Sequence, residues 1–165
     1  MWTRSFRLGV FLFLVLFSPG FSGFPYDPEY LNSVVGEKAV KFSDGFEMIM
    51  TLMQIEDQYP DFPSQREFLQ KTKIIPPEWE SRKPGDALRR GELAYMLVKM
   101  LRLKGGLKAR LLRMNQRFAM EELIYEGIMR AGHGRDLVTG QELVFVMTAT
   151  ANFMADRHEG TSHAS

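Results

Sequence analysis

Arg89 and Arg90 stand at the start of a predicted helix, in the sequence Arg-Arg-Gly-Glu-Leu. A helix N-terminus presents free N–H groups and a partial positive charge, which together favour an anion. An arginine adds a planar set of donors that matches a carboxylate or a phosphate. This turn is therefore the best candidate for a ligand contact in the sequence. The alternative is a solvated pair of arginines, with Glu92 serving only the end of the helix.

A basic segment follows over residues 99–117, which contain no acidic residue. Its leucines are interleaved with the cations, so the segment is amphipathic and predicts a surface for anionic lipid or wall polymer. The alternative is an exposed polar face without a partner. The cations are Lys99, Arg102, Lys104, Lys108, Arg110, Arg113 and Arg117.

Trp79 lies in a long proline-bearing loop over residues 73–88, and Tyr59 precedes that loop. Either ring offers a flat apolar face that can stack on a sugar. Trp79 is therefore a third candidate for ligand binding. The alternative is that the two rings cover the core, because a long loop needs apolar contacts to remain ordered.

The sequence predicts no catalytic site, no metal site and no cofactor. Glu92 and Glu142 are the most visible pair of acids, but both fall in the first turn of a predicted helix, where capping explains them. His133 and Asp136 share a glycine-rich turn, and a metal or acid–base role would need further ligands. No phosphate-binding loop or nucleophile motif is present. We therefore expect a protein that is not an enzyme.

Residues 1–22 have the organisation of a secretory signal peptide. Arg4 and Arg7 precede the uncharged apolar run of residues 8–17, and small residues follow. The run is shorter than the roughly 20 residues that span a bilayer. We expect export to the periplasm, cell envelope or exterior. An uncleaved N-terminal anchor is the alternative, and membrane contact otherwise comes only from the basic segment.

Composition narrows the class further. The 165 residues include no cysteine, which excludes disulfides, a thiol nucleophile and a cysteine-linked lipid. Removing residues 1–22 deletes two arginines and no acid, so the formal charge moves from +1 to −1. Bulk attraction to nucleic acid is therefore not predicted. Hydrophobic residues make up 45% of the chain, enough for a core that needs no disulfide.

Apolar residues recur at helical spacing, and no stretch alternates with the period of a strand. We predict an all-α fold, a small bundle of five to six helices, over residues 23–155. Residues 156–165 lack apolar anchors and are predicted to be a disordered tail.

Two parts of this domain repeat one pattern: a short helix, a turn, a loop and a longer helix. Glu67-Phe68-Leu69 matches residues 121–123, Ile74 falls opposite Ile128, and Leu88 matches Val138. The second loop is shorter by a few residues, and residues 42–53 resemble the long helix of a third, incomplete unit. Helix–loop–helix units of this kind bury their apolar faces against one another. The alternative is coincidence between two capped amphipathic helices.

The repeat resembles the S-layer homology family over about residues 40–155. In that family the long helix opens with a motif close to Ile-Thr-Arg-Ala-Glu. Here residues 88–93 match it with Arg90 in the arginine place, and residues 138–143 keep Thr139 and Glu142 but lose the arginine. The resemblance implies a pseudo-threefold bundle that attaches exported proteins to anionic cell-wall polymer. The resemblance predicts the fold better than it predicts the ligand, because one of the three motif arginines is present.

We therefore expect an exported, non-enzymatic domain for attachment to the cell wall or cell envelope. Its partner is either an anionic wall polymer or an envelope protein. The alternative is a periplasmic adaptor or subunit that docks to a protein partner through methionine-rich helical faces, since methionine packs adaptably.

Overall fold

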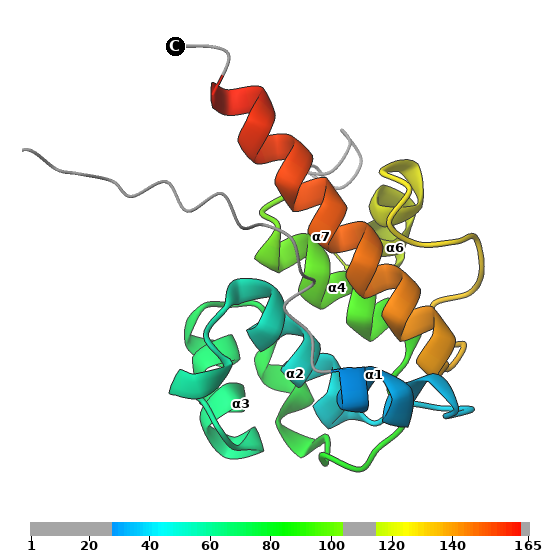
Figure 1. Ribbon diagram of the computed structural model, residues 1–165. Helices are drawn as coiled ribbons and strands as arrows, with labels where there is room; N and C mark the ends of the chain where they lie inside the picture. The colour runs from blue at the N-terminus through cyan, green and yellow to red at the C-terminus, as the bar shows by residue number, and fades with distance from the viewer. Residues whose placement is uncertain (1–27, 104–114, 163–165) are drawn as a thin grey trace, which may run out of the picture.

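The computed structural model describes residues 28–103 and 115–162, and these residues form an all-α bundle (Figure 1). Two short 3-10 helices, η1 and η2, lie in the connections. No described helix combines the length and apolar character needed to cross a bilayer. The helices are α1 (Pro28–Val35), α2 (Phe42–Met53), η1 (Glu56–Gln58), α3 (Phe62–Lys71), η2 (Pro77–Ser81), α4 (Arg90–Met100), α6 (Gln116–Tyr125) and α7 (Gly140–Ser162).

The predicted repeat is present in three units. Unit 1 is α1 with α2, unit 2 is α3 with α4, and unit 3 is α6 with α7. The short helices of units 2 and 3 begin alike: Asp61 accepts from the N–H of Ser64 at 2.8 Å, and Asn115 accepts from that of Phe118 at 3.1 Å. These oxygens satisfy donors that the helix leaves unpaired. Ser64 and Glu67 have the spacing of a capping box, but the structure places the cap of α3 at Asp61.

The short helices also end alike. Lys73 and Gly127 both have positive φ, 60° and 74°, the conformation that commonly terminates a helix. The N–H groups of Ile74 and Ile75 then return to the carbonyl of Leu69. In unit 3 the N–H groups of Ile128 and Met129 return in the same way to the carbonyl of Leu123. The matched isoleucines of the sequence repeat therefore occupy equivalent buried turns.

A closed ring of three backbone hydrogen bonds joins the units. Val40 donates to Val138, Val138 donates to Leu88, and Leu88 donates to Val40, at 2.9, 3.0 and 2.9 Å. Each residue lies two positions before a long helix, and each is fully buried. The three long helices therefore start around one point, in an approximate threefold arrangement.

The ring also fixes the register of unit 1 against the other two units. Lys41 corresponds to Arg89 and Thr139, and Asp44 corresponds to Glu92. The Asp44 carboxylate accepts from the backbone N–H of Lys41 at 2.7 Å, and Glu92 accepts from that of Arg89 at 2.9 Å. In unit 3 the Thr139 hydroxyl accepts from the N–H of Glu142 at 3.2 Å, so Thr139 caps α7.

The core lies between the long helices and beneath the short ones. Its fully buried members come from all three units, including Phe46, Leu93 and Val146. Most of its methionines are buried as well, so their adaptable side chains pack within this chain rather than on an open face. The buried methionines are Met48, Met50, Met96, Met120, Met129 and Met147.

α7 is longer than the sequence predicted, because it continues through the expected tail to Ser162 (Figure 1). Arg157 holds this extension to the bundle: its guanidinium donates to the carbonyl of Leu101 at 3.1 Å and lies 5.6 Å from the ring of Phe153. The arginine thus replaces the apolar anchor that the tail lacks. The predicted signal peptide, residues 1–22, lies outside the described residues.

Candidate functional site

Arg90 is buried and has partners inside the chain. Its side chain is 7% exposed, and its Nε donates to the Glu142 carboxylate at 2.6 Å. One of its terminal nitrogens donates to the carbonyl of Arg130. Arg90 therefore links the start of α4 to the start of α7 and to the loop before it. The sequence alternative of a solvated arginine pair is wrong for this residue.

Gly132 makes room for that guanidinium. A Cβ atom at this position would lie 1.5 Å from an Nη atom of Arg90. Glycine is therefore needed here for close approach.

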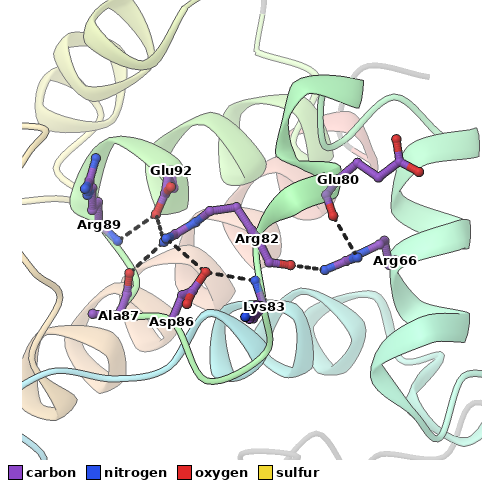
Figure 2. Close-up of polar contacts among 8 residues, drawn as sticks. All are labelled: Arg66, Glu80, Arg82, Lys83, Asp86, Ala87, Arg89 and Glu92. Carbon is purple, nitrogen blue, oxygen red and sulfur yellow. Dashed lines mark hydrogen bonds and ion pairs between the residues drawn. The ribbon is translucent and has the colours of Figure 1, made fainter.

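The carboxylate of Glu92 is buried and pairs with Arg82 (Figure 2). One guanidinium nitrogen of Arg82 lies 3.0 Å from Oε2 of Glu92 and 2.7 Å from the carbonyl oxygen of Ala87. The other lies 3.3 Å from Asp86. The first-turn glutamates of α4 and α7 are thus each paired with a guanidinium, and neither carboxylate is available as a catalytic acid or base without breaking that pair.

Arg66 completes this cluster from α3. It donates to the carbonyls of Glu80 and Arg82 (Figure 2). Its guanidinium lies 4.6 Å from the centre of the Phe62 ring. Sequence reasoning missed Arg66 and Arg82 because neither lies in a helix-start motif. No local motif marks Arg82, because the glutamate it binds lies ten residues later, in the next helix.

The N–H groups at the start of α4 are not free for an anion, contrary to the sequence prediction. Those of Arg90 and Gly91 donate to the carbonyls of Asp136 and Gly134, both at 2.9 Å. Those of the next two residues donate to the carbonyl of Arg89. The neighbouring loop therefore occupies this helix terminus. The side chain of Arg89 is exposed at this helix terminus.

Trp79 is half-buried in η2 and lies against other aromatic rings. Its ring centre is 5.9 Å from that of Phe42 and 5.6 Å from that of Tyr95. Burial raises the pKa of Tyr95, and the nearby carboxylate of Glu78 adds to the effect. These contacts favour the covering role over sugar stacking.

The described cations of the basic segment do not form one surface. Lys99 and Arg102 lie at the end of α4, where the Lys99 ammonium is 5.3 Å from the ring centre of Tyr95. Arg117 lies at the start of α6, whose Gln116 side chain packs beside Gly91 at the opposite end of α4. Lys104, Lys108, Arg110 and Arg113 lie outside the described residues.

A groove with a volume of about 880 Å³ runs between α6 and the turn at residues 132–136. Met120 and Ile124 form its apolar part, and Arg117 and Arg135 are exposed cations along it. Such a volume falls in the range of small-molecule and peptide sites. Its complete lining is Gln116, Arg117, Met120, Glu121, Ile124, Gly132, His133, Gly134, Arg135 and Asp136.

His133 and Asp136, which the sequence considered together, meet in this groove. The Asp136 carboxylate accepts from the backbone N–H of His133 at 3.0 Å, so it closes the turn. Asp86 makes the same contact with the N–H of Lys83 at 2.8 Å in unit 2. The repetition explains Asp136 as a turn residue. Within the described residues, no three acidic, histidine or cysteine side chains are placed to hold a metal.

Comparisons with protein-family models, with curated proteins and with solved structures find no match to this chain.

Proposed function

We propose that this chain is an exported, non-enzymatic helical domain that attaches to the cell envelope, with an anionic cell-wall polymer as its partner. The observation that carries the proposal is the ring through Val40, Leu88 and Val138, which places three equivalent helix starts around one point. That arrangement agrees with what the resemblance to the S-layer homology family implies. The signal-peptide pattern of residues 1–22 supplies the compartment.

The surface that supports polymer binding consists of Arg89 and Arg117. Both side chains are exposed, and both lie at the end of α4 where α6 begins. Arg117 lies 3.1 Å from Glu121, but the two side chains are 83% and 55% exposed. An ion pair this exposed contributes little, so an external carboxylate or phosphate can compete for the guanidinium. Arg90 supports this surface from beneath and does not itself reach the ligand.

Sedimentation with isolated cell-wall sacculi tests the proposal. The wild-type chain is expected to sediment with sacculi at low salt and to dissociate as salt screens the charges. Arg89→Ala and Arg117→Ala are each expected to weaken binding about twofold to fivefold, from roughly 0.5–1 kcal/mol per exposed ionic contact. A wild-type chain that stays in the supernatant at low salt would count against wall attachment.

Lys71→Ala is the matched control. Lys71 lies 2.7 Å from Glu67 one turn away on α3, with side chains 74% and 67% exposed. Lys71→Ala therefore removes the same kind of ion pair and the same charge as Arg117→Ala, but in unit 2 rather than unit 3. Equal losses from both variants would indicate nonspecific attraction. Lys99→Ala separately tests the opposite end of α4.

The alternative is a helical adaptor that docks to an envelope protein. The observation that favours it is a set of exposed apolar residues: Leu137 is 46% exposed and Tyr125 85% exposed. Crosslinking in the native host distinguishes the two, because an adaptor yields one dominant protein partner and a wall-binding domain yields polymer.

A further inference from the structure

The groove beside α6 carries one cation and one acid on each of its two walls. On the α6 wall these are Arg117 and Glu121, and on the turn wall they are Arg135 and Asp136. The four side chains together have no net formal charge. A ligand of a single charge therefore gains little here, whereas a ligand that carries both charges can pair with both.

The floor of the groove is aliphatic. Met120 is buried, and its sulfur would lie 3.3 Å from a Cβ atom at Gly134 on the facing turn. Ile124 is half-buried one turn further along α6. The described lining of the groove includes no phenyl, phenol or indole ring on which a sugar could stack. This floor therefore suits an aliphatic side chain better than a carbohydrate.

The charges on the α6 wall are spaced for a short ligand. Arg117 and Glu121 are four residues apart on one helix, which corresponds to about 6 Å along its axis. An extended dipeptide spans a similar length, about 7 Å. The ion pair that the two side chains form at 3.1 Å is 83% and 55% exposed and contributes little, so the charged ends of a ligand can replace it.

The two acids of the groove differ in what they already bind. The Asp136 carboxylate accepts from the backbone N–H of His133 and closes the turn. Glu121 has only the exposed contact with Arg117 among the printed interactions of the described chain. Glu121 is therefore the acid that we assign to an incoming ammonium group.

We propose that this groove binds a short zwitterionic peptide, two or three residues long, with a free amino end and a free carboxyl end. Its carboxylate pairs with Arg117, its ammonium group pairs with Glu121, and an aliphatic side chain lies on Met120 and Ile124. The groove volume of about 880 Å³ accommodates such a ligand. This inference goes beyond wall attachment and does not depend on it.

The dipeptide alanyl-leucine is the probe, added to the full chain, and methyl NMR of the methionines is the readout. The Met120 signal is expected to shift saturably at micromolar to millimolar dipeptide, while that of the fully buried Met48 stays in place. N-acetyl-alanyl-leucine and alanyl-leucine amide each lack one terminal charge. Each is expected to bind about twofold to fivefold more weakly. No Met120 shift at millimolar dipeptide, or equal affinities for all three compounds, overturns the inference.

Two variants assign the two ends of the ligand. Glu121→Gln is expected to weaken binding of alanyl-leucine about twofold to fivefold, but to leave binding of the N-acetyl compound unchanged, since that compound has no ammonium group. Arg117→Gln is expected to show the same pattern with the amide compound, which has no carboxylate. Equal weakening of the charged and the capped compound by both variants overturns the assignment.

Glu67→Gln is the matched control, because Glu67 forms the same kind of exposed pair with Lys71 on α3. A loss of dipeptide affinity as large as that of Glu121→Gln would show that the groove is not the site. Sedimentation of the wild-type chain with sacculi is measured in parallel. A chain that binds the dipeptide but does not sediment contradicts wall attachment alone, and the reverse result contradicts the peptide site alone.

Discussion

Arg90 and Glu142, which are 52 residues apart in the sequence, form a 2.6 Å ion pair between the starts of α4 and α7. The arginine comes from unit 2 and the glutamate from unit 3, so the pair joins two repeats. In unit 2 the equivalent glutamate, Glu92, is paired with Arg82 from the loop of the same unit, at 3.0 Å. Equivalent carboxylates are therefore satisfied by arginines from different parts of the chain.

Glu142→Gln tests the stabilising role of the inter-unit pair. The change leaves the Arg90 charge buried without its carboxylate, and we expect a loss of about 2–3 kcal/mol in the free energy of unfolding. This is below the usual cost of breaking a fully buried pair, since Glu142 is 20% exposed. Chemical denaturation measures it. Glu121→Gln, which affects the exposed pair with Arg117, should change stability by less than about 0.5 kcal/mol.

Gly132→Ala tests the space that Arg90 occupies. The added methyl must displace the guanidinium, so we expect the variant to lose about 1–2 kcal/mol, mainly through the Arg90–Glu142 contact. A double-mutant cycle with Glu142→Gln is the decisive measurement, because two changes that disrupt one contact are not additive. Fully additive losses would mean that the methyl is accommodated without moving Arg90.

Gly140→Ala tests how closely α1 of unit 1 packs against the start of α7 in unit 3. A Cβ atom there would lie 1.6 Å from the backbone oxygen of Val34, so α1 must move away from α7. Backbone is less able to shift than a side-chain end, and we expect a loss of about 1–3 kcal/mol in thermal or chemical denaturation. Gly85→Ala is the control, since nothing lies within 4 Å of its Cβ position. Equal stability of the two variants would contradict the close approach.

Asp61→Asn tests the helix cap of α3 through its pH dependence. Hydrogen bonds from the backbone and the hydroxyl of Ser64 hold the pKa of Asp61 below its ordinary value. The ionised form is thus favoured by folding, so its contribution is fully present above the unfolded pKa of about 3.9 and disappears as pH falls through the lower, folded pKa.

The measurement is the free energy of unfolding between neutral and acidic pH for wild type and variant. Asp61→Asn is expected to lose less unfolding free energy than wild type as the pH falls, since the amide oxygen still caps the helix but does not titrate. Asp57→Asn, an exposed change in η1, serves as the control. The cap assignment fails if the curves of wild type and Asp61→Asn run parallel down to the lowest pH.

The sequence alone determined the helices and their repetition. Helical spacing of apolar residues, with caps such as Thr139, is local information, and matches such as Leu88 with Val138 compare one segment with another. The all-α class and the internal repeat therefore followed without coordinates. The cap of α3 is ambiguous from the sequence, because Asp61 and Ser64 are both good capping residues.

Only the tertiary structure decided what the site residues do. The partner of Arg90 is 52 residues away, and the carbonyls that occupy the α4 N-terminus come from the loop before α7. Neither contact has a periodic or local signature in the sequence. The sequence therefore places these residues at the start of a helix, but it does not show that carbonyl groups already accept from the N–H groups there.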